Sequence, residues 1–270
     1  MMIQLCFQRY GQQKEAMNAI WSDVIPVSQL LTAAWNFWAV FSQSKAPWDQ
    51  RTPYDSNCNQ QKPVLAKTPD IFDRLAKINW TDEFVKRDSI DLARTTLDRL
   101  ATYARNRLFV SLHDWKEGKI NAEQVKIQKE AFTGIIESIR DVLAMHNDYS
   151  LYQTLVRMNK TEPIKNPNFD KVLLENASCG YCMSHQYELV NSWYLPTFHV
   201  MTDWLQDTLD KNQKTGFNDG KKLVLARKGE LYQKMMKTPL KEQSPAGTLS
   251  EADFKNCMIK CSKLAKIVLQ

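Results

Sequence analysis

Two cysteines have the spacing of a thiol redox motif, Cys179 and Cys182. At the start of a helix, the first thiolate would be stabilised by the positive end of the helix dipole. His185 and His199 follow, and two cysteines with two histidines are ligands that suit tetrahedral zinc, although the spacing fits only in part. The βαβ pattern expected around a redox motif is absent. We therefore expect buried cysteines or a disulfide here, with no metal and no cofactor; redox or zinc chemistry is the alternative.

Two other pairs share a helix face. Cys257 and Cys261 lie one helical turn apart on an apolar stripe, and because free cysteine is among the most often buried residue types, we expect them in the core. Asp88 and Asp91 are spaced i, i+3, and acidic residues in the first turn of a helix stabilise its positive end. We expect these two aspartates to serve the start of a helix rather than catalysis.

Other catalytic patterns do not occur in the sequence, which has no serine–histidine–acid order, glycine-rich phosphate loop or His-Glu-x-x-His. Eight tryptophans remain, several of them close to tyrosines within residues 181–204. Aromatic faces can stack on sugar rings, but such side chains also fill cores, where each buries about 150–250 Å². The residue types alone predict a soluble helical domain and assign no catalytic residue.

The pattern of apolar residues is that of helices. Residues 90–108 and residues 125–142 each repeat apolar side chains every three and four positions, and the turn at Gly118 between them predicts an antiparallel pair. A third helical run covers residues 190–205, where Pro196 is expected to kink or begin a helix. Residues 250–253 have capping-box spacing ahead of a C-terminal helix reaching residue 268. The predicted fold is all-α, a bundle-like single domain of antiparallel amphipathic helices over residues 1–270.

Two segments are predicted to be loops. Residues 42–68 contain three prolines among polar residues, and residues 211–221 contain two glycines with almost no periodicity. The longest apolar stretch, residues 24–41, is interrupted by proline and polar residues, so we expect buried helix and turn there and no membrane span.

The charge pattern argues against a nucleic-acid partner. The formal net charge is +6, but 30 acidic residues are spread among the basic ones and no basic block occurs. The first residues lack the layout of a secretory signal. Taken alone, this layout implies the cytosol. Three N-glycosylation acceptor patterns, at Asn79, Asn159 and Asn176, stand against it, so the residue patterns leave the localisation open.

Four segments resemble, in order along nearly the whole chain, a helical part of the family 89 glycoside hydrolases, the α-N-acetylglucosaminidases. Residues 7–11 (FQRYG), followed by a helix with Trp21, are similar to the segment just after the catalytic barrel. Residues 62–65 (KPVL) and 88–94 (DSIDLAR) are similar to the family's Arg-Pro-Ser and Asp-x-x-Asp-Leu-x-Arg segments. Tyr181 with residues 188–198 (ELVNSWYLPTF) is similar to its Asp-Tyr-Ala, Gly-Leu and Tyr-Tyr-x-Pro-Arg-Trp segments. Gly180 and Thr197 depart from the family's aspartate and arginine, and its Trp-Gly pair is not evident around residues 172–175.

The resemblance implies the C-terminal helical domain of a retaining glycosidase that removes terminal α-linked N-acetylglucosamine. Both catalytic glutamates of such an enzyme belong to its barrel, so no catalytic residue is expected in this chain and it should not hydrolyse substrate alone. The family's helical domain packs on the barrel and closes one wall of the sugar pocket, and the tyrosine matching Tyr181 faces the sugar. Tyr181 is therefore the substrate-binding candidate, because its ring can cover an apolar sugar face while its hydroxyl hydrogen-bonds.

The implied partners are the barrel of the same enzyme and a glycan that ends in N-acetylglucosamine. The family also implies a lysosomal or secreted glycoprotein, with the barrel and a leader preceding these residues in a longer reading frame. The alternative is a stand-alone helical interaction or carbohydrate-binding module without catalysis.

Overall fold

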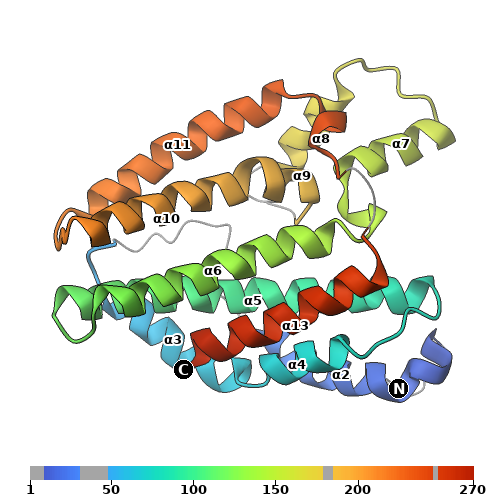
Figure 1. Ribbon diagram of the computed structural model, residues 1–270. Helices are drawn as coiled ribbons and strands as arrows, with labels where there is room; N and C mark the ends of the chain where they lie inside the picture. Colours follow the sequence, from blue (N-terminus) through green and yellow to red (C-terminus); the bar gives the residue numbers. More distant parts are fainter. Residues whose placement is uncertain (1–8, 31–47, 179–184, 246–248) are drawn as a thin grey trace. The chain divides into compact units, whose positions relative to one another are not determined.

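The computed structural model describes residues 9–30, 48–178, 185–245 and 249–270, which form helices joined by short connections (Figure 1). No β-strand occurs among these residues, and the predicted all-α fold is confirmed. The chain divides into two compact units. The first contains residues 1–40, 51–145 and 249–270, and the second contains residues 41–50 and 146–248.

The first unit is built on two long antiparallel helices, α5 (Glu83–Lys116) and α6 (Ala122–Leu143). Four shorter helices pack around them, namely α2 (Lys14–Ser28), α3 (Thr52–Leu65), α4 (Thr68–Leu75) and α13 (Glu251–Leu269). The helix pair α5 and α6 that the apolar periodicity predicts is therefore present. Gly118, at φ +75°, supports the turn between them because glycine adopts this left-handed conformation without strain.

Side-chain caps fix where these helices begin. The Asp82 carboxylate accepts hydrogen bonds from the first backbone amides of α5, and Asn121 forms a capping box with Gln124 at the start of α6. The capping box predicted before the C-terminal helix is confirmed, since Ser250 Oγ accepts from the Asp253 amide at 3.2 Å and the Ser250 amide donates to the Asp253 carboxylate at 2.9 Å. Local sequence thus sets three of the helix starts.

The loop predicted for residues 42–68 is wrong from Thr52 onward, because residues 52–65 form α3. Pro53 lies at the first turn of this helix, where its missing N–H has no helical partner to lose. Tyr54, Cys58 and Leu65 are buried along one face, so the helix is held by packing despite its polar composition.

The second unit contains two longer helices, α10 (Leu195–Asp210) and α11 (Phe217–Lys237), which pack against each other. Its shorter elements are η2 (Asn147–Tyr149), α7 (Leu151–Thr161), α8 (Phe169–Ser178), α9 (Tyr187–Leu189), a π-helix (Val190–Tyr194) and α12 (Leu240–Gln243). Pro196 lies in the first turn of α10. Because α9, the π-helix and α10 follow one another without a gap, the proline marks a change from π-helix to α-helix within one helical run, and the predicted start of a new helix there is not observed.

The loop predicted for residues 211–221 is wrong in its second half. Gly216, at φ +81°, is the N-cap of α11, and the helix includes Gly220. Gly220 faces the Trp204 indole of α10 so closely that a Cβ atom at this position would lie 2.1 Å from Trp204 Cε2. The glycine that suggested a loop is instead required for two helices to approach each other.

None of the helices in the described ranges has the length and hydropathy needed to cross a membrane. Residues 24–28 of the apolar stretch belong to α2, which contains Pro26, and residues 31–41 lie outside the described ranges.

Candidate functional site

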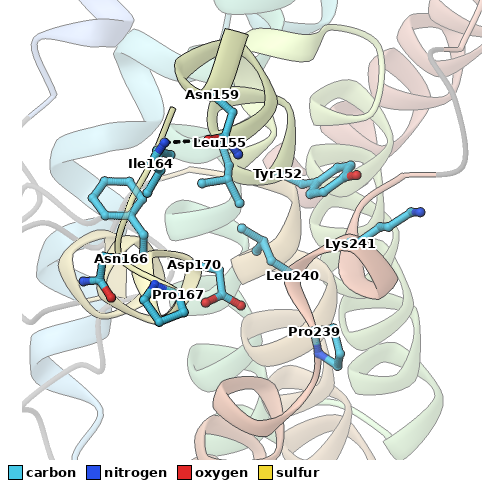
Figure 2. A pocket seen from close by; sticks show the side chains of 11 residues that line it. Tyr152, Leu155, Asn159, Ile164, Asn166, Pro167, Asp170, Pro239, Leu240 and Lys241 are labelled. Atoms are coloured by element: carbon cyan, nitrogen blue, oxygen red, sulfur yellow. Dashed lines mark hydrogen bonds between the residues drawn. The ribbon is translucent and has the colours of Figure 1, made fainter. Parts of the chain in front are cut away.

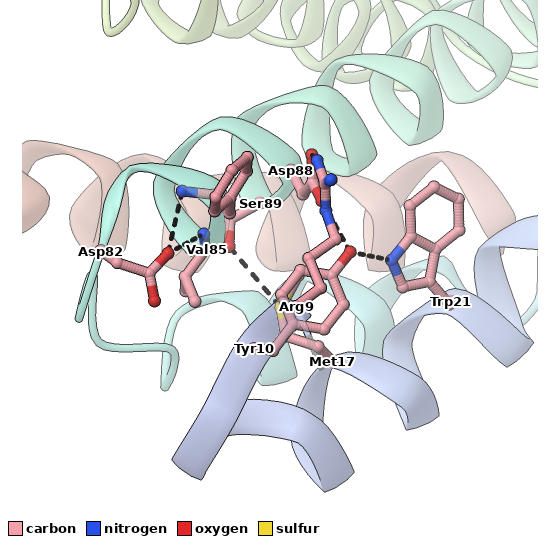
Figure 3. Close-up of polar contacts among 9 residues, drawn as sticks. Arg9, Tyr10, Met17, Trp21, Asp82, Val85, Asp88 and Ser89 are labelled. Carbon is pink, nitrogen blue, oxygen red and sulfur yellow. Dashed lines mark hydrogen bonds and ion pairs between the residues drawn. The ribbon is translucent and has the colours of Figure 1, made fainter. Parts of the chain in front are cut away.

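Two of the segments that carry the family resemblance meet in one polar cluster in the first unit (Figure 3). The Arg9 guanidinium donates two hydrogen bonds to the Asp88 carboxylate, at 2.6 and 2.9 Å, and forms an ion pair with it. The Tyr10 hydroxyl donates to the same carboxylate at 2.6 Å and accepts a hydrogen bond from Trp21 Nε1 at 2.9 Å. Residues 79 positions apart are therefore joined through one aspartate.

This cluster changes the interpretation of the predicted aspartate pair. The start of α5 is capped by Asp82, so the prediction that Asp88 and Asp91 serve the helix start is wrong. Asp88 lies more than one turn inside the helix and binds Arg9 and Tyr10, whereas Asp91 pairs with Arg94. The sequence pattern showed a shared face but not how far upstream the helix begins.

Burial, followed by the hydrogen bond to Asp88, raises the pKa of Tyr10 from 10.0 to about 12. The hydrogen bond to the Asp88 carboxylate also raises the pKa of Arg9. At neutral pH the cluster therefore holds a neutral Tyr10 phenol and a charged Arg9 guanidinium, both donating to Asp88, and it joins the start of the chain to α5.

The cysteine predictions are borne out where the structure describes them. Cys257 and Cys261 are buried in α13 with their Sγ atoms 4.0 Å apart, which confirms core packing. Cys179 and Cys182 lie outside the described residues, and His199 is exposed. Among the residues that the structure describes, no three histidine, cysteine or acidic side chains gather in a way that could hold a metal ion.

Tyr181, the substrate-binding candidate, also lies outside the described residues, between the end of α8 and the start of α9. An aromatic cluster of Trp193, Tyr194 and Tyr232 occupies the elements that follow it. The Trp193 ring centroid lies 4.8 Å from that of Tyr194 and 4.9 Å from that of Tyr232. Because Trp193 and Tyr194 are buried against each other, they serve as packing and leave no free face for a sugar.

Lys228 extends over this cluster, with Nζ 5.0 Å from the centroid of the Trp193 ring. The indole Nε1 of Trp193 donates to the backbone carbonyl of Lys228 at 3.1 Å, which fixes the two residues to each other. Burial lowers the pKa of Lys228, and the aromatic face offsets part of that cost because it attracts the ammonium form. Lysine and indole thus stabilise the packing of α11 on the π-helix.

Glu188 is fully buried and determines where α7 begins. Its carboxylate accepts hydrogen bonds from the Ser150 hydroxyl at 2.5 Å, from the Leu151 amide at 2.9 Å and from the Tyr152 amide at 3.1 Å. The first two amides of a helix lack helical partners, and the positive end of the helix dipole favours an anion there. Glu188, within a segment that carries the resemblance, therefore positions α7 from 36 to 38 residues away.

A pocket of about 350 Å³ lies between α7, the start of α8 and the start of α12 (Figure 2). Tyr152, Leu155 and Asn159 line it from one face of α7, since they are spaced i, i+3 and i+7. The remaining lining residues come from the connection after α7, from α8 and from α12: Ile164, Asn166, Pro167, Phe169, Asp170, Pro239, Leu240 and Lys241.

The pocket combines apolar and aromatic side chains with a carboxylate and amides. Within the described part of the chain, neither Asp170 nor Lys241 has an ion-pair partner. Such a lining suits a small ligand with apolar faces and several hydroxyl or amide groups. A second hollow of about 700 Å³ lies beside the same connection, and Ile164, Asn166 and Phe169 line both.

The three predicted glycosylation acceptors are all exposed. The Asn79 amide oxygen accepts a hydrogen bond from Lys255 Nζ at 2.7 Å, and Asn176 lies near the end of α8. Asn159 alone of the three lines the pocket of Figure 2. The predicted glycosylation itself stays a prediction.

The pocket and the role of Glu188 were missed by the sequence interpretation. One local signal was present, because Ser150 and Gln153 have helix-capping spacing, and the Gln153 amide donates to Ser150 Oγ at 3.2 Å. That pattern would have predicted α7. No local pattern links Glu188 to a helix start so far along the chain.

Comparison of the chain with family models, with curated proteins and with solved structures finds no match.

Proposed function

We propose that this chain is the helical C-terminal domain of a retaining α-N-acetylglucosaminidase, packing on the catalytic barrel and forming one wall of the pocket for terminal α-linked N-acetylglucosamine. The observation that carries the proposal is the Arg9–Tyr10–Asp88 cluster. Residues 7–11 and 88–94 each resemble a segment of the family, and side chains from both meet at one carboxylate. Segments that belong to one ancestral framework are expected to be coupled in this way.

A second support comes from the segment of residues 188–198. Glu188 caps α7, Trp193 packs on α11, and Thr197 is buried with its hydroxyl donating to the Trp193 carbonyl at 2.7 Å. Thr197 stands where the family has arginine, so any substrate contact made by that arginine is replaced here by an internal hydrogen bond. The proposed wall of the sugar pocket therefore rests on Tyr181 alone.

The chemistry of the proposed enzyme belongs to its barrel. A retaining glycosidase needs two carboxyl groups about 5–5.5 Å apart, one as nucleophile and one as acid and base. The role proposed for this chain is to orient the sugar and exclude water, which raises the rate by holding the substrate in a reactive geometry.

The test uses the complete reading frame. Its product is expected to contain a barrel with two catalytic glutamates and to hydrolyse an aryl α-N-acetylglucosaminide, whereas the 270-residue chain alone is expected to show no turnover. Hydrolysis by the chain alone that disappears on mutation of one of its own carboxylates would contradict the proposal, as would a complete protein without a barrel.

Tyr181 is tested in that complete enzyme by two substitutions. Tyr181→Phe removes only the hydroxyl, so kcat/KM should fall by the equivalent of about 0.5–1.5 kcal/mol if the hydroxyl binds the sugar. Tyr181→Ala also removes the ring and should cost clearly more in kcat/KM. If Ala lowers the melting temperature while the folded fraction keeps its kcat/KM, Tyr181 is a packing residue and the pocket wall is refuted.

A further inference from the structure

Asn159 lies at the rim of the pocket between α7, α8 and α12, and its side chain is held in one orientation (Figure 2). The Ile164 amide donates to Asn159 Oδ1 at 2.8 Å. Because a backbone N–H is a donor, the facing amide atom must be the oxygen, and the nitrogen must point elsewhere. Asn159 Nδ2, the atom that N-glycosylation substitutes, has no hydrogen bond to the described residues. A sugar on Nδ2 therefore leaves the bond to Ile164 intact.

We propose that the pocket beside Asn159 binds the first N-acetylglucosamine of a glycan attached to Asn159. The inference rests on the proposed function in one respect, since that function implies passage through a glycosylating compartment. The inference goes beyond the proposed function because it gives one of the three acceptor patterns a structural role and names the occupant of the pocket.

The lining of the pocket suits this occupant. The faces of a pyranose ring carry C–H groups that pack on aromatic and aliphatic side chains, which Tyr152, Ile164 and Phe169 supply. Its hydroxyl and acetamido N–H groups need acceptors. The half-buried Asp170 carboxylate accepts the Lys171 amide at Oδ1, at 2.9 Å, and has no ion-pair partner among the described residues, so its second oxygen is the acceptor for the sugar. The volume of about 350 Å³ lies at the small end of the range for ligand pockets, about 300–1,000 Å³.

Attachment at the rim explains how an open pocket could be filled. A single sugar has few atoms with which to offset the entropy lost on binding, so a free monosaccharide should bind weakly. A sugar tethered to Asn159 is held at an effective concentration on the order of millimolar or higher, and the same contacts then suffice. Asn79 and Asn176 serve as internal comparisons, because neither lines this pocket.

The modification joins Asn159 Nδ2 to the anomeric carbon of the sugar. The bond from that carbon to the phosphate of a lipid diphosphate-linked donor breaks, the lipid diphosphate leaves with the bonding electron pair, and the amide proton passes to a base of the transferase. The pattern Asn159-Lys160-Thr161 supplies the acceptor and the hydroxyl residue that such transferases require. No group of the chain itself is consumed.

The test expresses the full chain behind a secretory leader in a eukaryotic cell, so that glycosylation does not depend on the natural route of the protein. Mass spectrometry of the peptides should find Asn159 occupied. An endoglycosidase that leaves one N-acetylglucosamine should leave the melting temperature unchanged. Thr161→Ala, which abolishes the acceptor pattern, should lower it by about 2–4 °C, the shift expected for a few sugar contacts.

Two controls separate the sugar from the side chains. Thr161 Oγ1 donates to the Arg157 carbonyl at 3.2 Å, so the same Thr161→Ala variant is compared with the parent chain from bacteria, where neither carries a glycan. The fall in melting temperature that Thr161→Ala causes in the bacterial protein is subtracted from the fall in the eukaryotic protein, which leaves the part that depends on the glycan. In a Tyr152→Ala background the glycan-dependent part of the shift in melting temperature should become smaller, because one of the three apolar side chains that the sugar packs on is gone. Asn176→Gln, at a position that does not line this pocket, should leave the glycan-dependent part of the melting temperature unchanged.

An unoccupied Asn159 in a chain glycosylated at Asn79 or Asn176 overturns the proposal. A fall in melting temperature on Thr161→Ala that is equal in the bacterial and the eukaryotic protein also overturns it. A trimmed protein that melts like the unglycosylated one also overturns it, since the first sugar would then contribute nothing. None of these results bears on whether the complete enzyme hydrolyses an α-N-acetylglucosaminide, so the two proposals fail separately.

Discussion

Gly220 and Gly229 lie on the same helix, α11, in opposite surroundings, and alanine at each position gives a matched pair of variants. A Cβ atom at Gly220 would lie 2.1 Å from Trp204 Cε2, whereas nothing lies within 4 Å of a Cβ atom at Gly229. Both substitutions add the same helix propensity, about 1 kcal/mol in favour of alanine. The difference between the two variants therefore isolates the steric cost at Gly220.

The size of that cost follows from how far the indole must move. Carbon atoms in contact lie about 3.5 Å apart, so Trp204 must shift by roughly 1.4 Å. The indole packs on Trp48 at 5.4 Å and on Phe217 at 6.1 Å between ring centroids, which restricts this movement. Overpacking of this kind costs about 1–3 kcal/mol, and more where the neighbours cannot relax.

Chemical denaturation followed by circular dichroism should thus find Gly229→Ala more stable than the parent chain by about 0.5–1 kcal/mol. Gly220→Ala should be less stable than Gly229→Ala by about 1–3 kcal/mol or more. Hydrogen exchange should place the loss in α10 and α11. Equal stability of the two variants would refute the close approach of Gly220 to Trp204, and with it the packing of these two helices.

Three further predictions concern buried polar groups. Glu188→Gln should lower the free energy of unfolding by about 1.5–3 kcal/mol and speed amide exchange in α7, because it weakens three hydrogen bonds to a buried carboxylate. Glu242→Gln, at an exposed position, is the control. A Glu188→Gln protein as stable as that control would rule out the cap. Burial raises the pKa of Tyr10 to about 12, so the contribution of the protonated Tyr10 phenol to the free energy of unfolding should be complete below pH 10 and lost as the pH rises towards 12. In urea titrations at several pH values, Tyr10→Phe should abolish that part of the pH dependence. Burial also raises the pKa values of the Cys58 thiol, to about 12, and of the Cys261 thiol, so both should resist a thiol reagent at pH 8 until the protein is unfolded.

Periodicity and capping patterns were enough to predict the long helices of the first unit. Residues 90–108 and 125–142 lie in α5 and α6, whose apolar faces repeat over several turns. Prolines and glycines misled the prediction where their position in a helix decides their effect. Pro53 begins α3 instead of breaking it, and Gly220 serves a close contact that no neighbour in the sequence reveals.

The pocket could not be predicted, because it depends on contacts between distant segments. Glu188 sets the start of α7 across 36 to 38 residues, and the pocket walls come from three helices and a connection. The same holds for Arg9 and Asp88, which lie 79 positions apart in the sequence and are joined by a hydrogen bond. Tyr181 was found by resemblance alone, so its role stays a prediction.

The central claim, that this chain belongs to an α-N-acetylglucosaminidase, is tested most directly on the native protein. An antibody against the described part of the chain would isolate it from its source, and nuclear magnetic resonance would follow an aryl α-N-acetylglucosaminide during its hydrolysis. We predict release of N-acetylglucosamine with the α anomer formed first, as a retaining mechanism requires. Intact, folded native protein that leaves this substrate unchanged, or releases the β anomer first, would contradict the account.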